Sequence, residues 1–297
     1  KYTIAFDRAF IDMRPYTWLQ LTGGRIGVPF FGSDLVWADD LSVDGGVVRV
    51  RPFMSDTFEG SIVAGAFPLQ EIELSPDDKW MYGTQALAEW KGEREFRARL
   101  GVGYYSYDNI VGVASPPGST INEFTAPQFL QKGNTLFNIS SDPARPLLGL
   151  ASDYRLLNLT GSVDVAAFRE ARFTLLGDYV RNLGFDGADV ARRVGTEVER
   201  RNIGWQVRAQ LGTPQLTLKD NWQVFLAYKY LQRDATLDAF TDPTFRLGGT
   251  DAKGYILGGS YGLQRNLWTT LRWISTDSID GPPLKADILQ VDLNARF

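Results

Sequence analysis

The sequence predicts an all-β fold, a transmembrane antiparallel up-and-down β-barrel, and three observations support this. Long stretches alternate strictly between apolar and polar residues, which is the period of a β-strand. These stretches run for roughly 9–15 residues, whereas strands of soluble sheets average about 5–6. The connections alternate between short and long along the chain, as the periplasmic turns and extracellular loops of outer-membrane barrels do.

The alternation is clearest in the last stretch, where Leu289, Val291 and Leu293 share one face and Gln290 and Asp292 share the other. A soluble β-sandwich would alternate in the same way but with shorter strands, so the strand length favours the membrane barrel. We expect 13 strands, which in chain order span 2–12, 17–27, 45–52, 59–67, 80–91, 94–106, 154–168, 171–182, 200–212, 221–232, 253–264, 267–276 and 285–297.

Aromatic residues fall near strand ends on the apolar face, which is typical of the interfacial girdles of membrane barrels. These residues are Tyr104, Trp222, Tyr228, Tyr230 and Trp273. The predicted strands cover the whole chain, so residues 1–297 are expected to form one barrel domain.

The predicted number of strands is odd, whereas bacterial single-chain barrels usually have an even number. We therefore expect 14–16 strands in the whole barrel, with the missing N-terminal strand or strands upstream of this sequence. The orientation of the barrel follows if the terminal Phe297 lies at the periplasmic side. In that orientation every tight connection is periplasmic and every long one is extracellular. A barrel of this size leaves an aqueous lumen, because only barrels of about eight strands are filled by side chains.

The composition argues against several classes of function. The chain has no cysteine and no histidine, so it lacks disulfides, thiolate chemistry and the commonest general base and metal ligand. Its net charge of −4 gives no sign of a nucleic-acid partner. We therefore expect no enzyme activity, no catalytic residue, no cofactor and no metal site. The acidic pairs Asp39–Asp40 and Asp77–Asp78 are expected to be solvated loop ends, because no loop has the spacing of a calcium-binding EF-hand.

The strand alternation predicts twelve charged residues that line the pore. A generic wet interior of paired charges and a basic ladder that favours anions both remain open. Against the ladder, the connections expected to be extracellular are acidic, with Asp34, Asp39, Asp40, Glu71, Glu73, Asp77 and Asp78. The predicted pore-lining residues are Arg49, Arg51, Glu89, Arg97, Arg99, Asp164, Arg172, Asp178, Arg208, Lys229, Arg272 and Asp292.

The connection 107–153 is the candidate for a constriction loop. A connection of this length without clear periodicity is uncommon, and such loops are usually functional or disordered. Its apolar residues suggest that it folds against the inner wall, although packing on the outer rim or against a neighbouring subunit also remains open. These residues are Phe124, Phe129, Leu130, Leu136 and Phe137.

Two stretches resemble the putative porin family of Gram-negative outer-membrane β-barrels. They are Gly24–Leu41, with the sequence GRIGVPFFGSDLVWADDL, and Pro127–Ile139, with the sequence PQFLQKGNTLFNI. The terminal Phe297 resembles the C-terminal aromatic residue by which such barrels are recognised for insertion. The coiled coil that some members carry does not occur in this sequence. The resemblance implies diffusion of small solutes and supplies no catalytic residue.

The expected function is that of an outer-membrane porin, a water-filled channel for passive diffusion of small hydrophilic solutes and ions. A structural or tethering envelope barrel and a substrate-specific channel remain alternatives. The expected partners are outer-membrane lipid, lipopolysaccharide and the solutes themselves, and a homo-trimer remains open.

Overall fold

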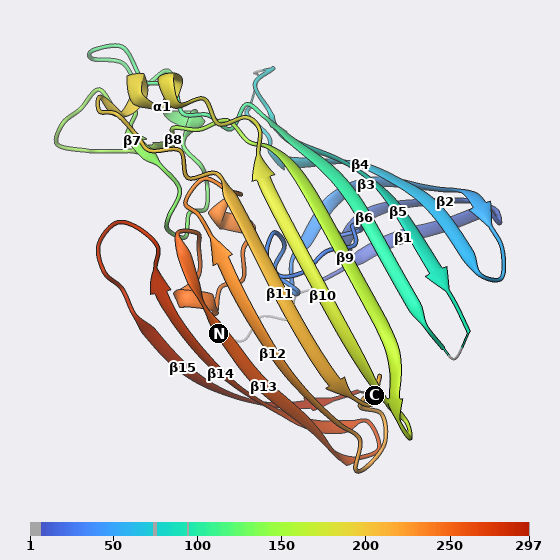
Figure 1. Cartoon of the computed structure of the whole chain (residues 1–297). Coiled ribbons are helices and arrows are strands. Elements are labelled where there is room, and N and C mark those ends of the chain that lie inside the picture. The colour runs from blue at the N-terminus through green and yellow to red at the C-terminus, as the bar shows by residue number, and fades with distance from the viewer. Residues whose placement is uncertain (1–6, 74–75, 94, 297) are drawn as a thin grey trace, which may run out of the picture.

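The structure is a computed structural model that describes residues 7–73, 76–93 and 95–296. A single antiparallel sheet of 13 strands makes up most of it, and each long strand pairs with its neighbours in the chain (Figure 1). The strands are β1 (Ala9–Tyr16), β2 (Leu19–Gly27), β3 (Ser42–Met54), β4 (Phe58–Gln70), β5 (Lys79–Lys91), β6 (Arg97–Asp108), β9 (Arg155–Phe168), β10 (Ala171–Asn182), β11 (Ile203–Gly212), β12 (Trp222–Leu231), β13 (Ala252–Gln264), β14 (Leu267–Ser278) and β15 (Ala286–Ala295).

All 13 predicted strands are present, and the predicted all-β up-and-down architecture is confirmed. The first strand is displaced, since β1 covers Ala9–Tyr16 rather than 2–12, part of which lies outside the described residues. The predicted strands leave a short connection over 13–16, which contains Pro15. Proline is tolerated there because β1 is an edge strand and its register with β2 shifts between Met13 and Tyr16.

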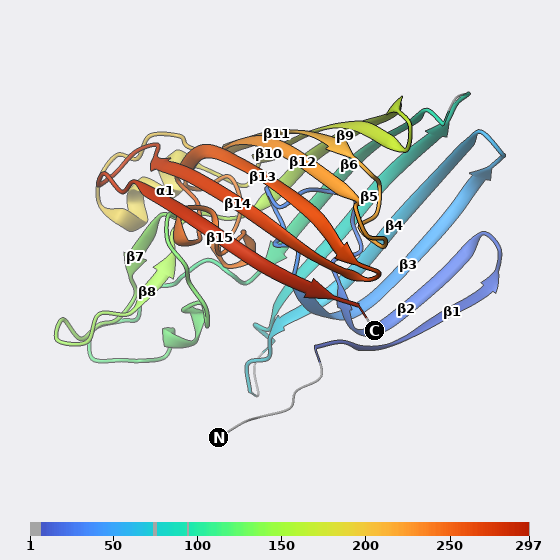
Figure 2. The same cartoon turned by 90° about the horizontal axis from the view of Figure 1, so that it is seen from below.

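The connections confirm the predicted alternation. Short turns such as 17–18, 169–170 and 265–266 gather at one end of the sheet, which we call the short-turn end. The longer connections, including 28–41 and 232–251, start from the other end, called the long-loop end. This arrangement lets the chain form a meander without crossovers (Figures 1 and 2).

The long connections also contain structure that the sequence pattern did not reveal. The short strands β7 (Leu136–Asn138) and β8 (Leu148–Leu150) form a separate two-stranded sheet. Helix α1 (Gly187–Val194) begins after Asp186, whose side chain accepts hydrogen bonds from two backbone N–H groups of the first turn. Gly195 ends the helix in the left-handed conformation with φ of 83°. The remaining helices are the 3₁₀ turns η1 (Glu123–Thr125), η2 (Asp238–Phe240) and η3 (Phe245–Leu247).

The large sheet is curved but not closed, because β1 and β15 are its two edges and each pairs on one side only among the described residues (Figure 2). Both edge strands run from the long-loop end to the short-turn end, as strands separated by an even number of antiparallel steps must. Direct pairing between them would therefore be parallel. A fully antiparallel closed barrel requires an odd number of further strands, in agreement with the expected 14–16.

The largest apolar cluster lies within the curve of the sheet. It joins inward-facing residues such as Phe67, Met81 and Tyr105 to Leu35 and Trp37 of the connection between β2 and β3. This connection, residues 28–41, is hereafter called the inner segment. The inner segment adds Phe30, Leu35, Val36 and Trp37 to the apolar side chains that the strands supply to this core.

Candidate functional site

The inner segment crosses the concave face of the sheet and is hydrogen-bonded to several strands. The backbone N–H of Phe31 donates to Gln85 Oε1 of β5, and Gln85 Nε2 donates to the Phe31 carbonyl, both at 2.7 Å. Ser33 donates from its backbone N–H and its hydroxyl to Asp178 Oδ2 of β10, at 3.0 and 2.6 Å. At its far end the Ala38 N–H donates to the carbonyl of Phe240. The segment therefore spans the interior instead of forming an external loop.

Inward-facing glycines make room for the aromatic rings of this segment. A Cβ atom on Gly83 would lie 2.4 Å from Cζ of Phe30, and one on Gly101 would lie 3.2 Å from the ring of Phe31. Any larger residue at Gly83 would displace the Phe30 ring. The glycines in β5 and β6 thus shape the wall to receive the inner segment.

Asp34 forms the most deeply buried ionic contact of the inner segment. Lys229 Nζ of β12 donates to both the backbone carbonyl and Oδ2 of Asp34 at 2.9 Å, and Gln206 Nε2 of β11 donates to Oδ1 at 2.7 Å. The Lys229 side chain is only 2% exposed. Burial alone would raise the pKa of Asp34, but the Lys229 charge and the hydrogen bonds hold that pKa below its ordinary value.

These contacts correct the prediction that the acidic residues of 28–44 lie in an extracellular loop. Asp34 is inside the sheet, and Asp39 lines interior cavities together with Arg208. The spacing of charges in the sequence does not distinguish a loop that folds outward from one that folds inward. The apolar run Leu35–Trp37 beside Asp34 was the available signal, because a solvated loop does not bury such a run.

Two of the predicted pore-lining residues, Asp178 and Lys229, lie beneath the inner segment and are almost fully buried. Asp178 also accepts hydrogen bonds from Asn158 Nδ2 at 2.6 Å and from the Thr160 hydroxyl at 3.0 Å. These two charged groups therefore hold the segment against the wall, and neither side chain is open to solvent.

Several of the other predicted residues cluster on β3–β6, β9 and β10 toward the short-turn end. Arg51 pairs with Glu59 at 3.1 Å, and Arg172 forms ion pairs with Asp164 and Glu95. Arg97 of β6 lies opposite Asp164 of β9. Glu89 of β5 lies opposite Glu59 of β4 on one side and Arg99 of β6 on the other.

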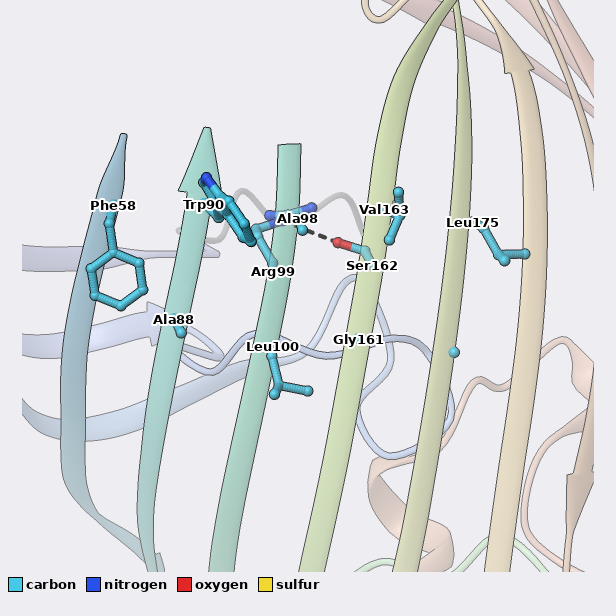
Figure 3. Close-up of a pocket in the computed structure, with 11 residues that line it drawn as sticks. Phe58, Ala88, Trp90, Ala98, Arg99, Leu100, Gly161, Ser162, Val163 and Leu175 are labelled. Carbon is cyan, nitrogen blue, oxygen red and sulfur yellow. Dashed lines mark hydrogen bonds between the residues drawn. The ribbon is translucent and has the colours of Figure 1, made fainter. Parts of the chain in front are cut away.

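The two remaining arginines on this side contact the inner segment. Arg49 Nη2 donates to the Pro29 carbonyl at 3.2 Å. The guanidinium of Arg99 lies 4.4 Å from the centre of the Phe31 ring and donates to Ser162 (Figure 3). The sequence thus predicted that Arg49 and Arg99 face inward, but it did not predict their contacts with the inner segment.

A polar cavity of about 430 Å³ lies between the inner segment and strands β11–β15, and we call it the chamber. It contains the other three predicted pore-lining residues, Arg208, Arg272 and Asp292, and Arg272 pairs with Asp292 at 3.0 Å. A smaller cavity of about 190 Å³ shares Asp34, Asp39 and Arg208 with it. The charged residues of the chamber are Asp34, Asp39, Asp40, Arg208, Asp242, Arg272 and Asp292.

The predicted constriction loop 107–153 packs at the long-loop end against the connection 232–251. Asn134 Nδ2 donates to the Arg233 and Thr236 carbonyls, and Thr135 donates from its N–H and hydroxyl to Asp234 at 2.9 and 2.6 Å. Burial raises the pKa of Asp238 to about 6 in this contact. The segment that extends across the interior is the inner segment, and a constricting role for 107–153 stays a prediction.

The outward face of the sheet is apolar. Aliphatic residues such as Leu100, Val102 and Leu226 are about half exposed there. Aromatic residues flank them toward both ends. Toward the long-loop end these are Tyr82, Tyr104, Trp205, Tyr228 and Tyr255, and toward the short-turn end they are Phe58, Trp90, Phe168, Trp222 and Tyr261. This pattern matches the two girdles of a membrane barrel.

A shallow hollow of about 340 Å³ interrupts the outward face (Figure 3). It forms where Gly161 of β9 and Gly177 of β10 are paired across the strands and neither carries a side chain. Leu100, Val163 and Leu175 surround it. Its apolar lining continues the character of the outward face, so the hollow belongs to that face and not to the polar interior.

Phe297, the predicted insertion signal, lies outside the described residues. Within the described ranges, no set of three or more acidic residues is arranged to hold a metal ion. No helix in those ranges has the length and apolar character needed to cross a membrane.

Known proteins similar to this chain include two solved structures and one protein family. Among solved structures, the chain is similar to LpxR from Salmonella typhimurium, with 9% identity, a TM-score of 0.30, and coverage of 85% of this chain and 88% of that one. It is also similar to OccD3 (OpdP) of Pseudomonas aeruginosa, with 11% identity, a TM-score of 0.35, and coverage of 94% and 75%. The comparison with curated proteins found no match. The model of the family described as putative porin matches residues 1–297, so the chain belongs to that family and is a porin-like β-barrel.

Proposed function

We propose that the chain forms a water-filled channel in the outer membrane of a Gram-negative bacterium, through which small hydrophilic solutes and ions diffuse passively. The observation that carries this proposal is the contrast between the two faces of one sheet. The outward face is apolar between aromatic girdles, whereas the inward face bears paired charges around polar cavities. A sheet that only anchored the protein in lipid would have no need of such an interior.

The inner segment gives this channel its narrowing. It crosses from β3 to β12 and fills part of the interior with the buried side chains of Phe30, Leu35, Val36 and Trp37. The space that remains beside β11–β15 is the chamber, which is lined by charges of both signs. Solutes would therefore pass a short polar constriction rather than a wide open pore. Outer-membrane lipid and lipopolysaccharide would contact the apolar outward face.

Conductance of the purified protein in a planar lipid bilayer tests this function. We expect stepwise current increases in potassium chloride, and a salt gradient would report the ion preference in the same recording. Protein that has been boiled serves as the control and should give no steps.

A structural or tethering role predicts a different result from the same material. Protein that shifts its gel mobility on boiling, and is therefore a folded barrel, but never conducts would contradict the channel and favour that role. If the protein does conduct, swelling of liposomes in sugars of increasing size would give the upper size limit of the solutes that pass.

A further inference from the structure

We propose that the chamber is a binding site for small zwitterionic solutes, which carry one ammonium and one carboxylate group. This inference rests on the proposed channel function and names the class of solute that the channel prefers. Two guanidinium groups and three carboxylates line this one cavity, and within the described residues the three carboxylates form no ion pair. No solute with a single charge satisfies both sets.

The basic side of the chamber consists of Arg208 and Arg272. The Arg208 guanidinium lies 4.1 Å from the centre of the Phe225 ring and donates to Gln210 at 3.3 Å. It interacts electrostatically with Asp34 and Asp39 but forms no ion pair with any described residue. Arg272 donates through Nη2 to Asp292, but its Nε is buried without a hydrogen-bond partner among the described residues. Arg208 thus retains donors for an incoming carboxylate, which guanidinium groups bind in a planar, bidentate manner.

The acidic side consists of Asp39 and Asp40 of the inner segment and Asp242 of the connection 232–251. Asp39 and Asp40 are exposed to the chamber, and within the described ranges neither accepts a hydrogen bond or forms an ion pair. Asp242 accepts from the backbone and hydroxyl of Thr244 and forms no ion pair in those ranges. These carboxylates come from two connections that are distant in sequence, and they offer oxygen acceptors to an ammonium group.

The other two carboxylates of the chamber are already neutralised. Lys229 pairs with Asp34 and Arg272 pairs with Asp292. The carboxylates without such partners are therefore those of the acidic side, and Arg208 is the guanidinium without one. A simple anion would be attracted by Arg208 but repelled by the acidic side. A simple cation would be attracted by the three carboxylates and repelled by Arg208 alone, so it is the stronger competitor of a zwitterion. A zwitterion places each of its charges next to the complementary one.

The dimensions and walls of the chamber suit a small organic molecule. Its volume of about 430 Å³ lies within the roughly 300–1,000 Å³ of small-molecule sites. Phe225, Trp268 and Ile274 provide apolar wall between the charged groups. The carbon chain that separates the two charges of the solute would lie against these side chains.

Interruption of single-channel current tests the proposal. The probes are glycine, β-alanine, 4-aminobutanoate and 6-aminohexanoate, in which the two charges become progressively further apart. Propanoate and propylamine carry one charge each and serve as comparison solutes. In potassium chloride at neutral pH, we expect at least one zwitterion to interrupt the current at concentrations where the singly charged solutes have no effect.

Two substitutions locate the site. Arg208→Gln and Asp39→Asn should each weaken the block by the best zwitterion roughly tenfold, as expected for the loss of one charged hydrogen bond. Arg192→Gln and Asp189→Asn on the exposed helix α1 remove the same charges away from the chamber and should leave the block unchanged. Asp39 has no described hydrogen bond, so its variant should fold even if the Arg208 variant does not.

The outcomes separate this inference from the proposed function. A folded barrel that never conducts would overturn both. A conducting channel that singly charged solutes block as well as zwitterions do would overturn the zwitterion site alone. Zwitterion block that survives both chamber substitutions would also overturn it, because the binding would then lie elsewhere in the channel.

Discussion

Replacement of Lys229 by methionine tests how the inner segment is held in the interior. Methionine has a similar length and an apolar side chain that can still pack on the Phe245 ring, but it removes the cation–π contact in which Lys229 Nζ lies 4.8 Å from the ring centre. The substitution removes both hydrogen bonds to Asp34 and leaves that carboxylate with Gln206 as its described side-chain donor. We therefore ask whether the segment detaches or stays in place with an altered charge.

The magnitudes favour a segment that stays in place. Removing one partner of a buried ion pair costs about 3–5 kcal/mol, because the other charge stays buried without compensation. Burying Phe30, Leu35, Val36 and Trp37 contributes about 1.5–3 kcal/mol each, and these side chains are at most 7% exposed. The apolar contacts thus outweigh the lost pair. The uncompensated burial of Asp34 should then raise its pKa, whereas Lys229 lowers it in the parent protein.

Single-channel recording between pH 4 and pH 8 measures the consequence. We expect Lys229→Met to conduct at close to the parent level, because the segment remains bound. Its reversal potential should differ from that of the parent in a pH-dependent way, because Asp34 becomes charged only as the pH rises. In the double variant Asp34→Asn/Lys229→Met, the difference from the parent should no longer depend on pH. A large increase in conductance would refute this reasoning, because it would mean that the ion pair, and not the apolar contacts, holds the segment.

Three further predictions concern topology, local stability and selectivity. An epitope inserted in 183–199 should be reached by antibody on intact cells and one at 265–266 should not; the reverse pattern would overturn the predicted orientation. Since the pKa of Asp238 is raised to about 6 from 3.8, its folded-state contact is stabilised by protonation, and roughly 3 kcal/mol of stability should be lost as the pH rises from 4 to 6. Hydrogen exchange in the connection 232–251 should show faster opening at pH 7 than at pH 4. The substitution Asp238→Asn should reduce this dependence of the opening on pH. Replacing Arg97 and Arg99 together by glutamine should shift the reversal potential toward cations without loss of the fold, and an unchanged value would mean that neither faces the narrowest point.

The sequence was sufficient to predict the strands because each carries its own signal. A strand with lipid on one side and a polar interior on the other must alternate with period two, and this requirement acts on every residue pair along it. In β15 the apolar Leu289, Val291 and Leu293 are each at least 68% exposed, while the residues between them face inward. The strand whose bounds were predicted wrongly is β1, because Pro15 is a residue typical of turns but lies here within an edge strand.

The inner segment could not be located in the same way because its position depends on contacts distant in sequence. Asp34 and Lys229 are 195 residues apart, and Phe31 and Gln85 are 54 residues apart. No local periodicity encodes such pairs. What the sequence does contain is a set of inward positions that would be unusual for an open pore: Gly83 with no side chain, and Gln85 with its amide in an otherwise apolar surrounding. Each is explained once Phe30 and Phe31 are placed over it.

This placement changes the electrostatic prediction for the pore. The strands alone place eight basic and four acidic residues on the inward face, which predicts a preference for anions if the acidic connections lie outside the barrel. The inner segment brings Asp34, Asp39 and Asp40 to the interior, and Asp242 joins them from 232–251. These four carboxylates equal the excess of positive charge that the strands alone supply. Among these residues the charges then balance, and both signs occur on each side of the inner segment. Arg97 and Arg99 lie opposite Asp164 and Glu89 on one side, and Arg208 and Arg272 lie with the chamber carboxylates on the other. Groups of both signs around one cavity act on molecules with two opposite charges more strongly than on simple anions, because only the former gain from both kinds of group.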